Sequence, residues 1–398
     1  MNLLIFTNLF PTPSDPERGV FTLQLVRQFN KHTNLTVVCP LPYFPRFKFL
    51  SRFKKWHALS QVPNLYYIEG IKVYSPKYVL IPKISEGIHD WLMARSIKRF
   101  LLKLQNKYHF DVINSKWLYP DACAIDHIFK DSGIPHITAG LGSDINYEFK
   151  NNAKKHKILK MLNNTDATIV VSGSLKDILV NAGVADEKIH VIHNGVDTTQ
   201  FSLRDKSKAR AELNINQNEK IIIFVGRLSL EKGITTLIDA LKIIISNQHD
   251  ISLHLYLIGD GPLREALENQ VLTLGLSRYV TFIGKTPHSN ISKWMSSADI
   301  FCLPSFNEGC PNVVLEALGS GRPVVASRVG AIPDVVSNKS GILFSAGNVN
   351  ELASALTRAL EVSWDPHIIQ SSIAGLSWES SAQKYLQIFT NAIHKQKS

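Results

Sequence analysis

Short apolar runs alternate with longer amphipathic stretches along most of the chain, and this alternation limits its fold more than any other feature. Continuous apolar runs of this length are typical of strands in a parallel sheet that is buried on both faces. The stretches between them, such as 21–30 and 91–107, repeat apolar residues at helical spacing. The pattern predicts an α/β protein with helices on both faces of its sheets. The predicted strands are 3–7, 35–39, 112–114, 134–138, 168–171, 221–225, 252–258, 280–283, 300–303 and 324–326.

The length and a change of composition predict two domains. A chain of 398 residues exceeds what one hydrophobic core usually organises. The composition turns polar after Asp197, and a fresh series of strands begins near 221. We therefore expect one domain over 1–198 and a second over 199–376. The last stretch, 377–398, shows apolar residues at helical spacing and is expected to form a helix that returns to the first domain.

Several classes of protein are disfavoured by the same sequence. No run approaches the roughly 18 apolar residues that a membrane-spanning helix needs. The apolar N-terminal segment lacks the positive flank and cleavage site of a signal peptide and reads as a buried strand. The four cysteines are widely separated and form no CxxC pair, so we expect reduced thiols and no metal site.

Positive charge is concentrated in the first half of the chain. The whole sequence carries a net charge of +11. Residues 1–198 hold 25 Lys and Arg against 16 Asp and Glu, an excess of 9, whereas the remainder has an excess of only 2. Such an excess suits an anionic partner, although solvated faces can carry it without any partner.

Aromatic and basic residues interleave in the segment Tyr43–Trp56. This combination suits a helix lying on an anionic membrane surface. Nucleic acid could use the same chemistry, but no recognition motif accompanies it, so we expect no specific nucleic-acid partner. The alternative is a loop whose aromatic rings pack on the core. A second basic stretch, 150–160, has no predicted role.

Two carboxylates flank the start of a predicted helix in the second domain. The strand 300–303 is followed by a loop with Glu308, then by Pro311, which suits the first turn of a helix because it lacks an N–H. The helix is expected over 313–318 and contains Glu316. Its N-terminus would attract an anion, and the two carboxylates could hold polyol hydroxyls beside it. Alternatively, Glu308 only complements the helix dipole and Glu316 is a solvated surface residue.

Two further loops follow strands of the same predicted sheet. The segment 224–233 reads FVGRLSLEKG, and its Arg227 and Lys232 provide a guanidinium fork and a point charge for phosphate oxygens. The segment 257–262 reads LIGDGP, a glycine-flanked turn where backbone can approach a ligand closely. Because the carboxyl ends of parallel strands meet at one edge, the three loops are expected to form one anion-binding site.

The order GRLxxEKG, GDGP and SxxEGxPNVVLEALxxGxPVVAS resembles the C-terminal domain of the family 4 (group 1) glycosyltransferases. The resemblance implies a GT-B fold, in which two Rossmann-like domains face each other across a cleft. It also implies a retaining transferase that uses a nucleotide-diphosphate sugar and needs neither a metal ion nor another cofactor. We find no acidic cluster after a strand that would hold such a metal.

The same resemblance implies roles for individual residues. Arg227 and Lys232 would hold the donor diphosphate, and with Glu308 they would form the catalytic set. Glu308 would bind the transferred sugar together with the backbone of 309–312, and Glu316 would bind the ribose. The loop 282–285 would contact the base, and Gly19 would lie in a glycine loop near the donor phosphate. The full implied donor set is Gly19, Gly226, Arg227, Lys232, Gly259, Gly261, Ile283, Glu308, Gly309, Cys310, Pro311, Asn312, Val313 and Glu316.

The segments 117–122, 139–146 and 188–201 extend the resemblance over nearly the whole chain, with departures. Family members often carry a His before the GSD-like turn, but here Ala139 to Leu141 precede it. Lys116 stands where relatives often have a His, and could take over an anion contact. The acceptor-side residues implied by this match are Lys116, Trp117, Asp121, Ser143 and Asp144.

The sequence and the resemblance therefore predict transfer of a sugar to a hydroxyl of an oligosaccharide or polyprenyl-linked acceptor. A UDP-sugar is the favoured donor, and a GDP-sugar is the alternative. The family members most similar to this chain are bacterial enzymes that build cell-surface polysaccharides. This resemblance implies a cytoplasmic enzyme that is peripheral on the inner face of the cell membrane. A sugar-nucleotide epimerase or a pyridoxal-phosphate-dependent sugar phosphorylase would share the architecture. A basic nucleic-acid-binding protein is the alternative from another class.

Overall fold

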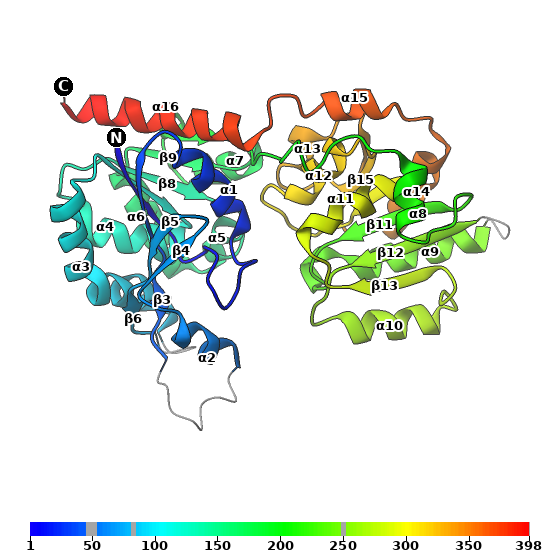
Figure 1. The fold of residues 1–398 in the computed structure, drawn as a ribbon, viewed down its shortest axis with the longest axis horizontal. Helices are drawn as coiled ribbons and strands as arrows, with labels where there is room; N and C mark the ends of the chain where they lie inside the picture. The colour runs from blue at the N-terminus through cyan, green and yellow to red at the C-terminus, as the bar shows by residue number, and fades with distance from the viewer. Residues whose placement is uncertain (45–53, 81–84, 248–251, 398) are drawn as a thin grey trace. The chain divides into compact units, whose positions relative to one another are not determined.

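The computed structural model describes residues 1–44, 54–80, 85–247 and 252–397. Within it the chain divides into two compact units. Unit 1 comprises Met1–His193 and Trp378–Ser398, and unit 2 comprises Asn194–Ser377. Each unit is built around its own β-sheet, and helices cover the sheet (Figure 1).

The main sheet of unit 1 has eight strands in the order β10-β9-β8-β7-β1-β2-β5-β4. The strands are β1 (Asn2–Phe6), β2 (Asn34–Val38), β4 (Leu65–Ile68), β5 (Ile71–Tyr74), β7 (Val112–Lys116), β8 (His136–Gly140), β9 (Ala167–Val170) and β10 (Ile189–Val191). A separate pair joins β3 (Leu41–Pro42) to β6 (Lys77–Tyr78).

One edge of this sheet departs from the expected parallel arrangement. Strands β4 and β5 pair antiparallel, with Ile68 opposite Ile71. The two residues between them, Glu69 and Gly70, both have positive φ angles, as a two-residue hairpin turn requires. The apolar runs did not predict this hairpin because its strands are short and partly exposed.

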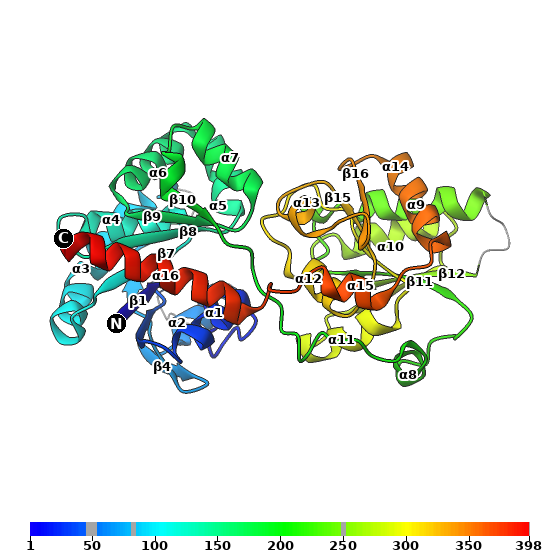
Figure 2. The ribbon, with the colours of Figure 1, turned by 90° about the horizontal axis from the view of Figure 1, so that it is seen from above.

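The helices of unit 1 cover both faces of its sheet. They are α1 (Val20–Phe29), α2 (Lys54–Gln61), α3 (His89–Tyr108), α4 (Cys123–Phe129), α5 (Ser143–Asn146), α6 (Asn152–Asn164), α7 (Gly173–Asn181) and α16 (Trp378–Lys397). On one face α16 runs beside α1 (Figure 2), and Tyr385 and Phe389 pack against Phe29. On the other face α3 and α4 bury a second apolar cluster. The C-terminal helix is therefore part of the core of unit 1.

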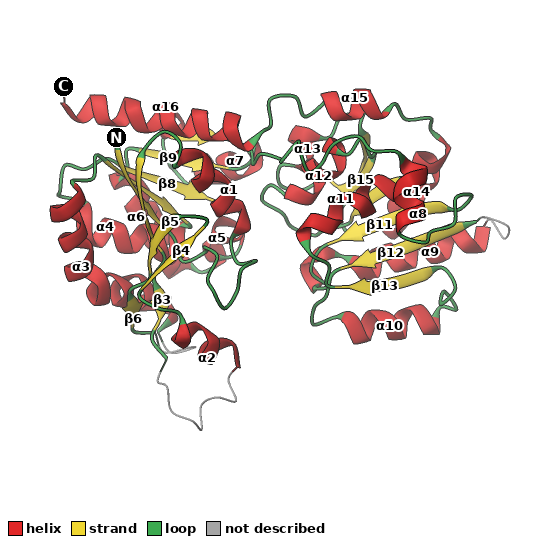
Figure 3. Ribbon diagram, viewed as in Figure 1, coloured by secondary structure: helices red, strands yellow, loops and turns green. Residues whose placement is uncertain are grey.

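Unit 2 contains a fully parallel sheet in the order β13-β12-β11-β14-β15-β16. Its strands are β11 (Lys220–Val225), β12 (Leu253–Ile258), β13 (Val280–Gly284), β14 (Ile300–Leu303), β15 (Val324–Ser327) and β16 (Gly341–Phe344). Its helices, coloured red in Figure 3, are α8 (Lys206–Glu212), α9 (Ile234–Asn247), α10 (Arg264–Thr273), α11 (His288–Ser297), α12 (Asn312–Gly319), α13 (Ile332–Val335), α14 (Val349–Glu361) and α15 (Pro366–Ser371).

Each strand predicted from an apolar run is present, and its ends differ from the prediction by at most two residues. All four cysteines are buried free thiols. Among the described residues, no helix combines the length and apolarity needed to cross a membrane. The predicted membrane segment Tyr43–Trp56 lies mostly outside the described residues, since 45–53 are not described.

Candidate active site

The sheet of unit 2 reverses its strand order between β11 and β14. Chain order runs outward from β11 through β12 to β13 on one side, and from β14 through β16 on the other. Loops that leave neighbouring strands at such a reversal diverge to opposite faces and leave a crevice at the carboxyl end of the sheet. The two loops here are 226–233 and 304–311, which are the loops that carry Arg227, Lys232 and Glu308.

Glycines let the neighbouring loops of this edge touch through their backbones. A Cβ atom on Gly259 would lie 1.9 Å from the carbonyl oxygen of Gly226, and one on Gly261 would lie 2.3 Å from that of Leu228. Leu228 and Asp260 also share a backbone hydrogen bond. Gly259 and Gly261 therefore have a packing role, whatever they do for a ligand.

Lys232 and Glu308 form an ion pair that joins the two loops at the reversal. The Lys232 ammonium donates to Glu308 Oε1 at 2.6 Å, and the Ser305 hydroxyl donates to the same oxygen at 2.7 Å. A short 3-10 turn (Leu230–Lys232) places the lysine, and Gly233 follows it with φ 63°. A Cβ on Gly233 would lie 2.1 Å from the Pro304 carbonyl oxygen, so only glycine lets the turn approach the second loop.

Helix α12 begins at Asn312, directly after the Glu308 loop. Pro311 has a ψ angle of 111° and is the N-cap residue, so the expectation of a proline inside the first turn is wrong by one position. The N-terminus of the helix keeps free N–H groups and the positive end of the helix dipole near Glu308. No acidic side chain occupies its first turn.

Asn194 fixes the loop before α12, and sequence reasoning did not single it out. Its side-chain amide donates to the Cys310 carbonyl oxygen at 3.2 Å and to Asn312 Oδ1 at 2.8 Å. The Gly309 carbonyl oxygen accepts from Ala331 at 2.7 Å. Asn194 belongs to the segment 188–201, whose resemblance to the family was the available signal.

Glu316 is buried inside α12 rather than solvated, so the surface alternative for this residue is wrong. Its side chain is 9% exposed, and Oε1 accepts a hydrogen bond of 2.8 Å from His288 Nε2. The second oxygen, Oε2, is buried and has no partner among the described residues. The Gln200 side chain donates to the backbone carbonyl of His288 at 2.8 Å, which fixes the imidazole beside Glu316.

The remaining predicted donor residues differ in exposure. Arg227 is exposed and pairs with no carboxylate among the described residues, so its guanidinium can accept an anion. Ile283 and Val313 are half-buried. Cys310 is buried, and this burial raises the pKa of its thiol to about 12, so the thiol stays protonated. Lys232 contacts the Glu308 carboxylate directly, the N-terminus of α12 follows four residues later, and Arg227 lies on the same loop as Lys232. This chemistry suits a diphosphate beside a polyol.

In unit 1, Gly19 has a structural reason to be glycine. It adopts φ 61° at the N-cap of α1, and a Cβ there would lie 2.2 Å from the Leu9 carbonyl oxygen. The strand-to-helix turn therefore needs glycine to fold, which accounts for Gly19 without a ligand.

Three of the predicted acceptor-side residues lie in the interior of unit 1. Lys116 is fully buried, and its ammonium lies 4.2 Å from the centre of the Tyr385 ring with no hydrogen-bond partner among the described residues. Both oxygens of Asp144 accept backbone N–H groups, from Leu118 at 2.9 Å and from Leu141 at 3.0 Å. Asp121 accepts the Asn8 N–H at 2.6 Å.

These positions contradict a direct anion contact by Lys116 and a direct acceptor contact by Asp144. Each side chain is enclosed, and Asp144 has its oxygens occupied by the loop that it organises. Burial raises the pKa of Asp144 to about 6 although these N–H groups favour its charged form. Ser143 remains exposed and Trp117 half-buried.

A cavity of about 530 Å³ lies beside the loop that follows β1 in unit 1, and the sequence did not predict it. Its polar lining residues are Ser14, Asp15 and Arg18, and its apolar wall includes Leu59 and Tyr78. Arg18 is half-buried and forms no ion pair with a described residue. Guanidinium, carboxylate and hydroxyl groups together offer both the donors and the acceptors that sugar hydroxyls need.

Two family models match the chain in succession. Residues 19–200 match the model described as Glycosyltransferase Family 4, and residues 205–370 match the model described as Glycosyl transferases group 1. An uncharacterized glycosyltransferase of Methanocaldococcus jannaschii is 30% identical over 273 residues, which are 68% of this chain and 70% of the relative. The chain belongs to this family of glycosyltransferases, and is an enzyme of class EC 2.4.

Two further similarities cover nearly the whole chain. TuaC of Bacillus subtilis, whose name places it in teichuronic acid biosynthesis, is 27% identical over 375 residues, 92% of each chain. The crystal structure of Anabaena HepE in complex with UDP covers 98% of this chain and 100% of HepE, with a TM-score of 0.75 and 19% identity. The fold is therefore that of the two-domain GT-B transferases, and the chain is a nucleotide-sugar-dependent family 4 enzyme.

Proposed function

We propose that this protein transfers a sugar, with retention of anomeric configuration, from a UDP-sugar to an acceptor hydroxyl in cell-surface polysaccharide synthesis. The observation that carries the proposal is the Lys232–Glu308 ion pair at the strand reversal, next to the N-terminus of α12. A UDP donor is favoured over GDP because HepE, which has the same fold, was crystallised with UDP.

The ion pair suggests how binding of the donor would rearrange the site. Without a donor, Lys232 is neutralised by Glu308. A diphosphate between Arg227 and Lys232 would compete for the ammonium, because two phosphate charges attract it more strongly than one carboxylate. Glu308 would then offer its carboxylate, which the Ser305 hydroxyl still orients, to the hydroxyls of the sugar. The exchange couples binding of the phosphates to orientation of the sugar.

The same groups would stabilise the transition state. Negative charge grows on the departing diphosphate as the bond between the sugar and the phosphate breaks. Arg227, Lys232 and the N-terminus of α12 would supply positive charge and N–H donors at that position, and electrostatic stabilisation of this kind is usually the largest catalytic term. The acceptor hydroxyl would attack from the face that the diphosphate leaves, and the leaving phosphate would accept its proton.

Glu316 would hold the ribose through its unpaired oxygen. Oε1 is taken by His288, whereas the buried Oε2 lacks a partner among the described residues. A hydrogen bond from a ribose hydroxyl to Oε2 would satisfy this buried acceptor. His288 would act as a positioning residue, because it fixes the carboxylate without contacting the sugar itself.

The acceptor would enter unit 1 through the cavity lined by Arg18, Asp15 and Ser14. An oligosaccharide or a polyprenyl-linked glycan fits this mixture of polar groups and apolar wall. The similarity to TuaC supports a polysaccharide product. Peripheral attachment to the inner face of the membrane through Tyr43–Trp56 is part of the proposal, and rests on the sequence of that segment.

Turnover of radiolabelled UDP-sugars and GDP-sugars, with and without glycan acceptors, tests the proposal. We expect release of nucleotide that depends on the acceptor, and a loss of about 10²–10³ in kcat for Lys232→Ala. Conversion of the donor sugar to an epimer without any acceptor would instead identify an epimerase. Undiminished transfer by Lys232→Ala would contradict the assigned roles.

A further inference from the structure

A cavity in unit 2 lies at the amino ends of β11 and β14, opposite the carboxyl ends that carry the proposed donor loops. Its volume is about 410 Å³. Lys220, which begins β11, and Asp299, which precedes β14, both line it. Because a strand rises roughly 3.3 Å per residue, the length of β11 separates this cavity from the proposed donor loops by about 20 Å. The two sites would therefore bind different molecules.

Positive side chains dominate the lining of this cavity. Four cations, Arg204, Lys206, Lys220 and Arg322, face it together with a single carboxylate, Asp299. Neither Arg204 nor Lys220 forms an ion pair with a described residue. Among the residues that line the cavity, four positive side chains therefore face one negative side chain.

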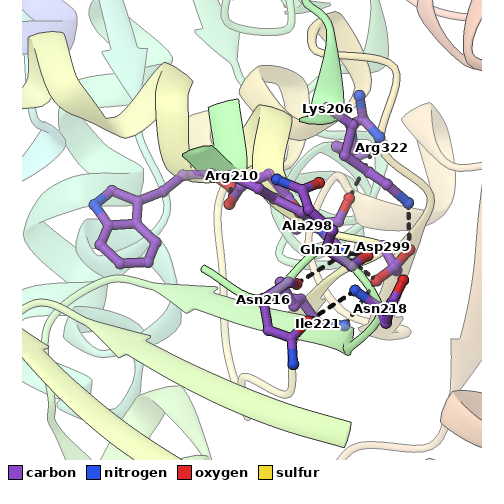
Figure 4. A network of polar contacts seen from close by, with 11 residues as sticks. Lys206, Arg210, Asn216, Gln217, Asn218, Ile221, Ala298, Asp299 and Arg322 are labelled. Carbon is purple, nitrogen blue, oxygen red and sulfur yellow. Dashed lines mark hydrogen bonds and ion pairs between the residues drawn. The ribbon is translucent and has the colours of Figure 1, made fainter. Parts of the chain in front are cut away.

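The carboxylate is already saturated by other groups. Asp299 accepts hydrogen bonds from Lys206 at 2.7 Å, from Arg210 at 2.8 Å and from the Ile221 N–H at 2.7 Å (Figure 4). Burial raises the pKa of Asp299, but these bonds outweigh it and hold the pKa below its usual range. The single negative charge of Asp299 is therefore shared between Lys206 and Arg210, and it cannot balance all the cations of the cavity.

Arg322 supplies a buried donor without a partner. Its exposed fraction is 8%, and its Nη1 donates to the Ala298 carbonyl oxygen at 3.3 Å. Its Nε is buried and has no hydrogen-bond partner among the described residues. A buried unsatisfied donor costs about 1–3 kcal/mol, and more when it is charged. An oxyanion in the cavity would remove this cost.

We propose that this cavity binds a phosphate group, either as the free ion or on a small phosphorylated molecule. Oxygen atoms of a phosphate can accept several charged N–H donors at once, including the planar fork of an arginine. The apolar part of the wall, which includes Leu360 and Trp364, leaves room for the remainder of a phosphorylated molecule.

A purely structural role explains only part of the cluster. Arg210 is buried and donates to the carbonyl oxygens of Ser297 at 2.9 Å and Gln217 at 2.7 Å, so it ties α8 to the end of the sheet. Arg204 and Lys220 are exposed and make no such bonds. Their position at the cavity is accounted for by an anion and not by the architecture of the sheet edge.

Isothermal titration with inorganic phosphate, at constant ionic strength set with sodium chloride, tests the site. The cavity variant is Arg204→Gln with Lys220→Gln, and both residues are exposed, so folding should survive. The matched control, Lys208→Gln with Lys339→Gln, removes the same charge elsewhere on unit 2. Saturating UDP is present in every titration, so that phosphate cannot occupy the proposed donor loops. A hexose monophosphate replaces phosphate in a parallel titration.

We expect saturable binding in the wild type, a loss of about tenfold or more in affinity in the cavity variant, and unchanged affinity in the control. Tighter binding of the hexose monophosphate would identify a phosphorylated molecule as the ligand class. Absence of binding above chloride, or binding that survives in the cavity variant, would overturn the inference. Failure of UDP to bind would count against the proposed donor site alone, because phosphate binding in this cavity does not depend on UDP.

Discussion

Replacing Lys116 by methionine is expected to stabilise the protein by an amount that falls as the pH rises. Burial lowers the pKa of the Lys116 ammonium from 10.5 to about 7. In the unfolded chain the lysine keeps its proton up to about pH 10.5, so unfolding takes up a proton between pH 7 and 10.5. The stability of the wild type therefore rises with pH through this window.

The size of the effect follows from the shift. One pKa unit corresponds to about 1.4 kcal/mol. The lysine therefore costs about 4 kcal/mol at pH 7, about 2 kcal/mol at pH 9 and less than about 1 kcal/mol at pH 10. The contact with the Tyr385 ring, 4.2 Å away, offsets roughly 1–2 kcal/mol while the ammonium is charged. Methionine fills a similar volume and carries no charge, so it removes the cost.

Urea unfolding of wild type and Lys116→Met at pH 7, 8, 9 and 10 measures this difference. Subtracting the free energies of unfolding of the two proteins at each pH cancels the contribution of the buried tyrosines and cysteines, because these residues titrate in both. Lys103→Met, on the exposed side of α3, is the control and should show no pH-dependent difference. A less stable Lys116→Met variant, or a difference that does not change with pH, would refute the reasoning.

Three further substitutions follow from the geometry. His288→Ala should weaken UDP binding about tenfold, since Glu316 loses the 2.8 Å bond that positions it, and His288→Gln should restore part of the loss in a UDP titration. Gly261→Ala should lower the free energy of unfolding by more than about 2 kcal/mol, because its Cβ would lie 2.3 Å from the Leu228 carbonyl oxygen, whereas Gly87→Ala, with nothing within 4 Å, should not. Arg18→Gln should raise the KM for the acceptor and leave UDP affinity unchanged. If the variant weakened acceptor and UDP binding equally, the cavity of unit 1 would not be the acceptor site.

Local sequence pattern was sufficient for most of the fold. Buried parallel strands are continuous apolar runs, so the ten predicted strands could be read from the sequence alone. The β4–β5 hairpin could not, because its strands alternate between buried and exposed residues and its turn is Glu69-Gly70 rather than a common turn pair. The strand reversal between β11 and β14 also needed the structure, since strand order is a property of packing.

The environment of individual side chains was harder to predict. From the sequence, both Glu316 and Lys116 could be expected at the surface, because charged residues are mostly exposed. Their burial depends on residues distant in the chain, His288 for one and Tyr385 for the other. The family resemblance assigns the motif glycines to a ligand, although Gly19, Gly259 and Gly261 are each explained by close approach to a carbonyl oxygen. No spacing in the sequence distinguishes these two reasons for a glycine.

Calorimetric titration of UDP into wild type, Lys232→Ala and Lys242→Ala tests the central claim most directly. Lys242 is an exposed lysine on α9 of the same unit and controls for loss of charge. The account predicts saturable binding of UDP to the wild type, unchanged affinity for Lys242→Ala, and affinity at least about tenfold weaker for Lys232→Ala. Equal affinity of all three proteins for UDP would contradict a diphosphate site at the Lys232–Glu308 pair.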